Sequence, residues 1–223
     1  MTRSIEDYRR IFEGAVAKYE GQAHFVKVIE QKGRPAFPSA PRNIAIIGIR
    51  HEGREIANRD DEADDIIALV RIDSDGLPMV KEYVGTTEPG KFDTVVNPQG
   101  DFRLNPGFYF FKLGIHHPND PPPKGKNPCL VPDCSILGER ARKGVAFNET
   151  DDKTWTDSGD TIHIHAGIGD VNKVGMWSAG CQVIAGTWAG EPWKEFFKYV
   201  QMATNFPVPY VLVMENDVPQ LLA

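Results

Sequence analysis

The sequence predicts a mainly β fold with added N-terminal and C-terminal helices, and three observations support this prediction. Short apolar runs rich in β-branched and aromatic residues recur between residues 44 and 214. Turn-forming residues separate these runs, which is typical of strands in an antiparallel sheet. Helical spacing of apolar residues appears near the two ends of the chain. A chain of 223 residues can bury a substantial core as one large domain with appendages.

Residues 1–43 are predicted to hold an N-terminal helix and a proline-rich connector. Apolar residues recur at helical spacing from Ser4 to Tyr19, and Ser4 followed by Asp7 is a helix-start signal. We expect this helix to pack on the domain, with binding to a partner as the alternative. Three prolines between Gly33 and Arg42 disfavour both helix and inner strand. The main domain is then expected over residues 44–223.

Several strands and one helix are predicted within the main domain. The Asp-Gly turn at residues 75–76 lies between two β-rich runs and is a strong hairpin signal. Pro192 at the start of an amphipathic stretch is typical of a helix N-terminus. The predicted elements are a buried strand over 44–49, the hairpin from 65 to 85, a strand after Gly107, a helix over 191–200 and a closing strand over 207–214.

The composition excludes two classes of partner. The formal net charge is −6 and the sequence pI is about 5.5, which argues against nucleic-acid binding because that needs a basic surface. No apolar run approaches the roughly 20 residues of a membrane span. The N-terminal sequence does not resemble a secretory signal, so the sequence predicts synthesis in the cytoplasm.

The chain contains three cysteines, Cys129, Cys134 and Cys181. The spacing of Cys129 and Cys134 allows a local disulfide, half of a metal site or two ordinary thiols. We favour two ordinary thiols, because a single C-x4-C pair is weak evidence for zinc.

The stretch from Thr161 to Ile184 holds the residues that point to chemistry. His163 and His165 alternate with isoleucines, so on a strand both imidazoles lie on one face. Cys181 follows sixteen positions after His165, which leaves room for a loop that returns beside the strand. Gly180 allows a tight bend before the cysteine, where backbone N–H groups can form an oxyanion hole. The pattern predicts a thiol nucleophile with a histidine base.

This stretch resembles the catalytic motif of the L,D-transpeptidase (YkuD-like) family. The family motif reads roughly I-H-G, then a loop, then S/T-H-G-C. Ile164 and His165 match the first part, and Ser178, Gly180 and Cys181 match the second. Ala179, Ala166 and Val183 stand where the family has histidine, glycine, and arginine or asparagine.

The resemblance implies a fold, an activity and a substrate. It implies a β-sandwich catalytic domain in which Cys181 is acylated by a peptidoglycan stem peptide and His165 is the base, with no cofactor. The acyl group would pass to an amine in transpeptidation. Passage to water, as in an L,D-carboxypeptidase or endopeptidase, is the alternative. Action in the periplasm or cell wall would then follow export or release, as for a secreted antibacterial or lytic protein with a secretion-system or immunity partner.

Four further residues are candidates for the site. Ser178 is expected to hydrogen-bond near the thiolate or to cap the turn. His163 is expected to orient His165, to contact substrate, to replace the missing histidine in space, or to be a satisfied strand histidine. Trp177 and Tyr109 are expected to line a substrate groove, with a place in the core as the alternative.

Other interpretations of the same residues stay open. His163, His165 and Cys181 form an alternative zinc ligand set, since zinc accepts nitrogen and thiolate ligands. A wall-binding module without activity is another alternative, and a buried structural cysteine a third. The tract from His116 to Ser135 is predicted to be a long loop that forms a lid or cleft wall. We expect His116 and His117 in this loop to be exposed to solvent, with a role as metal ligands as the alternative.

Overall fold

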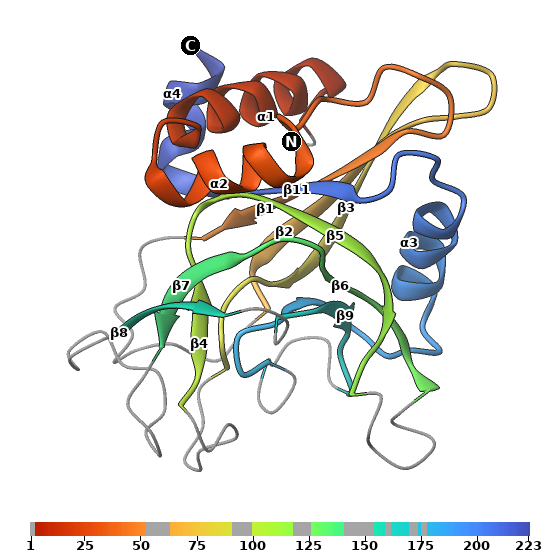
Figure 1. Ribbon diagram of the computed structural model, residues 1–223. Coiled ribbons are helices and arrows are strands. Elements are labelled where there is room, and N and C mark those ends of the chain that lie inside the picture. The colour runs from red at the N-terminus through yellow and green to blue at the C-terminus, as the bar shows by residue number, and fades with distance from the viewer. Residues whose placement is uncertain are drawn as a thin grey trace.

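The computed structural model describes most of the chain. The described residues are 3–51, 63–90, 100–117, 126–140, 154–158, 162–169, 174 and 178–223. For residues 154–158 only the backbone is described. The fold is mainly β with four α-helices in the described part, as the sequence predicts (Figure 1).

Eight strands form a closed barrel. Their order around the barrel is β1-β11-β5-β6-β9-β10-β3-β2, and β2 pairs with β1 to close it. The pairs β1 with β11 and β9 with β10 are parallel, and the others are antiparallel. The strands are β1 (Ile44–Arg50), β2 (Asp65–Ile72), β3 (Pro78–Thr86), β5 (Gly107–Ile115), β6 (Pro128–Pro132), β9 (Ile164–Ala166), β10 (Gln182–Ile184) and β11 (Val208–Met214).

The predicted β-sandwich is wrong, because a sandwich needs two facing sheets with edges of their own. The short pairing of β3 with β10 joins the two halves of the barrel. A Cβ atom at Gly85 would lie 2.2 Å from the carbonyl oxygen of Val183, so only glycine permits this approach. Closure removes the exposed sheet edges that would otherwise invite pairing with another chain.

A separate three-stranded sheet lies beside the barrel. Its order is β4-β7-β8, with antiparallel pairs throughout. The strands are β4 (Phe102–Leu104), β7 (Ile136–Arg140) and β8 (Thr154–Ser158). Phe102 at the start of β4 donates its backbone N–H to the carbonyl oxygen of Ala179 at 2.9 Å. The small sheet therefore supports the turn that carries Cys181.

Three helices gather over β5 and β11 on one side of the barrel, and α3 lies apart from them (Figure 1). They are α1 (Ile5–Tyr19), α2 (Ala23–Lys32) and α4 (Val218–Leu222), while α3 spans Glu191–Gln201. The predicted N-terminal helix is confirmed as α1, which begins with a reciprocal capping box between Ser4 and Asp7 and packs on the domain. No helix among the described residues is long and apolar enough to span a membrane.

Most of the predicted strands are confirmed, and one predicted loop is partly wrong. The strand from residue 44, the hairpin, the strand from Gly107, the helix from 191 and the closing strand all form. The tract from His116 to Ser135 contains β6, which is a strand of the barrel and pairs with β5 and β9. The apolar run of β6, C-L-V, is only three residues long and has prolines on both sides, so the sequence pattern favoured a loop.

Candidate active site

Three adjacent barrel strands place the histidines and two of the cysteines on one face. Ile164 of β9 pairs with Leu130 of β6 on one side and with Gln182 of β10 on the other. Side chains alternate along strands, so the residues next to these pair on the opposite face. The residues on that face include Cys129, His163, His165 and Cys181. The sequence analysis had placed His163, His165 and Cys181 in the candidate site.

The Cys181 thiol lies against the backbone of His163. The His163 N–H donates a hydrogen bond to Cys181 Sγ at 3.5 Å. Cys181 is half-buried. Burial raises the pKa of the thiol to about 11, and the His163 N–H opposes that shift by favouring the thiolate. At pH 7 the resting side chain is therefore a thiol.

The turn before Cys181 is held by Ser178. Ser178 Oγ donates to the Cys181 carbonyl oxygen at 2.8 Å and accepts the Gly180 N–H at 3.0 Å. Ser178 thus caps the turn, which was one of its two predicted roles. Gly180 has φ +131, and a Cβ atom there would lie 2.1 Å from the Phe102 carbonyl oxygen. Both the backbone conformation and the space require glycine.

The His165 imidazole has a defined tautomer. Its Nδ1 lies 2.6 Å from the Ala166 carbonyl oxygen, an acceptor, so Nδ1 carries the proton. The other nitrogen, Nε2, is buried and has no hydrogen-bond partner among the described residues. Burial lowers the pKa of His165 to about 4, so the ring is neutral at pH 7 with a lone pair at Nε2. The same burial disfavours the imidazolium, so Nε2 is a weak base in the resting site and would take up a proton only as negative charge develops beside it.

Trp188 orients the His165 ring from one side. The two rings stack with centroids 5.6 Å apart and an interplanar angle of 12°. Trp188 in turn packs edge-on against Trp193 of α3. The sequence analysis missed Trp188, because it lies after the motif in a short loop and has no spacing signal of its own. The predicted aromatic wall, Trp177, lies outside the described residues.

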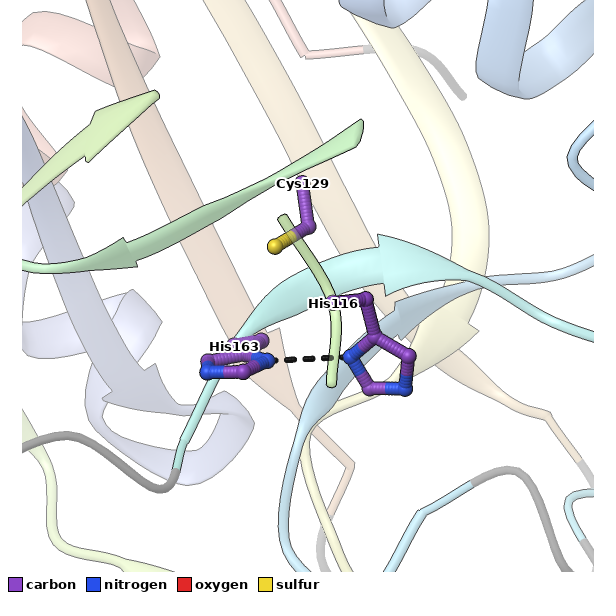
Figure 2. A group of neighbouring side chains, drawn as sticks. All are labelled: His116, Cys129 and His163. Carbon is purple, nitrogen blue, oxygen red and sulfur yellow. Dashed lines mark hydrogen bonds between the residues drawn. The ribbon is translucent and has the colours of Figure 1, made fainter. Parts of the chain in front are cut away.

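His116 joins the predicted histidines from the end of β5. Its Nδ1 lies 2.9 Å from His163 Nδ1, and its ring centroid lies 4.1 Å from that of His165. Figure 2 shows the two imidazoles of His116 and His163 facing each other through nitrogen, with Cys129 close by. His116 is half-buried while His117 is exposed, so the prediction of two exposed loop histidines is wrong for His116. We call His116, Cys129 and His163 the His-Cys cluster.

A polar network inside the barrel fixes the strand behind Cys181. Gln182 accepts the Tyr210 hydroxyl proton at 2.6 Å, and its amide donates to the Gly180 and Thr87 carbonyl oxygens. Strands β10 and β11 are not neighbours, so the contact with Tyr210 crosses the barrel interior. Arg50 donates to Thr87 from the same interior. Buried polar groups tied together in this way resist rearrangement of the turn.

Two other sequence predictions have different outcomes. Tyr109 is fully buried, packs against Phe25 of α2 and donates its hydroxyl to the Asn105 carbonyl oxygen, so it is a core residue. Cys129 and Cys134 are not joined in a disulfide, which leaves two of the three alternatives: the ordinary thiols that we favoured and a part in a metal site. Cys134 contacts the backbone of Phe110, whereas Cys129 belongs to the His-Cys cluster.

The arrangement combines a thiol held at a tight turn with a buried, neutral imidazole whose acceptor nitrogen, Nε2, has no hydrogen-bond partner among the described residues. Comparison of the chain with protein-family models finds no match, and searches of curated proteins and of solved structures find none either. The interpretation of the site therefore depends on its geometry and on the motif.

Proposed function

We propose that this protein is a cysteine-dependent acyl-transfer enzyme in which Cys181 is the nucleophile and His165 is the general base. The observation that carries the proposal is the buried His165 Nε2, which has its lone pair fixed by the Nδ1 contact and shares a strand face with Cys181. Nε2 makes no hydrogen bond to Cys181 Sγ in the structure. Catalytic hydrogen bonds are often long before substrate binds.

Proton transfer and attack occur together in the proposed mechanism. The Cys181 pKa of about 11 and the His165 pKa of about 4 make a resting thiolate and imidazolium pair unfavourable. As Sγ forms a bond to the carbonyl carbon of the substrate, its proton moves to His165 Nε2. The carbon–nitrogen bond then breaks, and His165 returns the proton to the departing amine. The product of this half-reaction is a thioester on Cys181.

The oxyanion is assigned to the backbone of the Cys181 turn. The Gly180 N–H donates to Ser178 Oγ, so an oxyanion at this nitrogen would compete with the serine. We propose that the N–H groups around Gly180 and Cys181 hold the oxyanion together, with the Gly180 N–H released by a small shift of Ser178. Removal of one such donor typically slows turnover by 10²–10³-fold.

The proposed substrate is a peptidoglycan stem peptide, and its support is the resemblance of the motif to the L,D-transpeptidase family. Cys181 would attack the amide that follows a meso-diaminopimelate or similar residue. Transfer to an amine gives a cross-link or an exchanged residue, and transfer to water gives a trimmed peptide. We propose that the chain reaches the wall by export or release, with a secretion-system or immunity partner.

The proposal is tested by incubating the protein with purified muropeptides and identifying the products by mass spectrometry. The parent should produce cross-linked, exchanged or trimmed species, and these products separate transpeptidation from hydrolysis. Cys181→Ala should produce none of them. Cys134→Ser is the matched control, because it removes a buried thiol outside the site and should keep full turnover. Binding of the wall without turnover by the parent would favour a non-catalytic module.

A further inference from the structure

We propose that the His-Cys cluster is a binding site for a zinc-type divalent cation. One ligand atom from each of His116, Cys129 and His163 lies within 4.8 Å of the other two. These residues come from three separate places in the chain: the end of β5, strand β6 and the residue before β9 (Figure 2). This ligand set shares only His163 with the alternative set considered from the sequence, which was His163, His165 and Cys181.

The three ligand atoms lie no more than 4.8 Å apart and could reach tetrahedral spacing by shifts of up to about 1 Å. Bond lengths of about 2.0–2.1 Å to nitrogen and 2.3 Å to sulfur put neighbouring ligand atoms roughly 3.3–3.7 Å apart. The two imidazole nitrogens, now 2.9 Å apart, would separate by a few tenths of an ångström. Since both face each other through Nδ1, an ion between them would replace the proton that they now share.

The donor types select the ion. Two imidazoles and one thiolate suit zinc and similar borderline ions, whereas calcium and magnesium prefer oxygen ligands. Burial raises the pKa of Cys129 to about 12, so the ion must displace the thiol proton and binding releases a proton to solvent. A three-residue site leaves a fourth position for water or a small anion.

The metal ligands and the proposed catalytic pair are different residues. His163 contacts Cys181 through its backbone N–H, whereas its imidazole contacts His116 through Nδ1. His165 uses Nδ1 for Ala166 and is not one of the three ligands. The metal site thus goes beyond the proposed acyl transfer, and Cys181→Ser should still bind the ion with parental affinity.

Binding is tested with the full chain, reduced, by competition for zinc against a chromophoric chelator and by absorption after cobalt loading. The parent should bind one ion per chain and show the intense visible bands of tetrahedral cobalt with a thiolate charge-transfer band. Loss of a ligand in Cys129→Ser or His116→Gln should weaken zinc binding by at least about 100-fold, since even outer-shell changes cost 10–100-fold. The matched controls Cys134→Ser and His24→Gln should bind like the parent.

Two results would overturn the proposal. One is zinc affinity in Cys129→Ser within about threefold of the parent, well below the effect expected for a lost ligand. The other is cobalt binding by the parent without a thiolate band, which needs no variant and so cannot be confused with misfolding. Failure of Cys181→Ala to alter muropeptide turnover would instead count against the acyl-transfer proposal and leave the metal site unaffected.

Discussion

The backbone N–H of His163 donates a hydrogen bond to the sulfur of Cys181, at a nitrogen to sulfur distance of 3.5 Å. This contact ties the nucleophile turn to the strand that carries the histidines. It also stabilises a thiolate as it develops, because an N–H donor favours the charged form. Because the donor is a backbone N–H, any residue except proline at position 163 could supply it, and the imidazole of His163 takes no part in this contact.

Replacement of His165 by glutamine should remove the base and preserve the shape of the site. A glutamine amide can donate to the Ala166 carbonyl oxygen but cannot accept the thiol proton. Turnover of a stem peptide should fall by about 10²–10⁴-fold, the usual contribution of general-base catalysis. Steady-state kinetics measure this, with His24→Gln as the control. Near-parental turnover in His165→Gln would rule out the assigned base.

The stability of the protein should decrease as the pH falls below about 6.5. Folded His165 has a pKa of about 4 against an ordinary 6.5, so between these values the unfolded chain binds a proton that the folded chain does not. The stability that this buried neutral ring provides is present above pH 6.5 and is lost towards pH 4, at up to about 1.4 kcal/mol per pH unit. Urea denaturation at several pH values gives the unfolding free energy as a function of pH, and the slope of that plot should be smaller for His165→Gln than for the parent. Identical slopes for parent and variant would contradict the assignment.

Gly180→Ala should destabilise the protein and abolish turnover. The new Cβ would meet the Phe102 carbonyl oxygen at 2.1 Å, and φ +131 is unfavourable for alanine. Gly76→Ala separates the two effects, because Gly76 has φ +82 and open space around it. We expect the free energy of unfolding, measured by chemical denaturation, to fall by about 1–2 kcal/mol in Gly76→Ala and by clearly more in Gly180→Ala. Equal losses would mean that the turn does not depend on the close approach of Phe102.

Tyr210→Phe should weaken the support behind the nucleophile. The variant leaves the buried Gln182 Oε1 without the hydroxyl at 2.6 Å, which costs about 1–3 kcal/mol of folding free energy. Turnover should fall while the substrate KM changes little, because the variant acts on the Cys181 turn and not on substrate. Tyr83→Phe is the matched control, since its hydroxyl contacts Glu195 near the surface at 3.3 Å. If Tyr210→Phe lost no more folding free energy and turnover than Tyr83→Phe, the polar network would not support the Cys181 turn.

Local signals in the sequence predicted much of the fold. The Ser4 and Asp7 capping box and the turn at Gly76 are encoded within a few residues, so the helix and the hairpin were predictable. Barrel closure was not, because it depends on long-range pairings such as Gly85 with Ile184. Helix α2 was missed as well, since Gln22 gives it no side-chain cap. Strand pairing of distant segments leaves no periodic trace in one sequence.

The candidate site was predicted in part for the same reason. His163, His165, Ser178, Gly180 and Cys181 lie within one stretch, and the structure keeps them together. Cys129 and His116 come from distant segments that only the pairing of β6 with β5 and β9 brings to the same face. Tyr109 is fully buried and packs against Phe25 of α2, an outcome that depends on contacts with a distant segment and has no local signal in the sequence.

The most direct test of the central claim is the intact mass of the protein quenched during turnover of a stem peptide. The account predicts a transient thioester adduct equal to the acyl part of the peptide without its departing amine, located on Cys181 by peptide mapping and absent in Cys181→Ala. Turnover that proceeds with no adduct, or with an adduct on Cys129 or Cys134, would contradict Cys181 as the nucleophile.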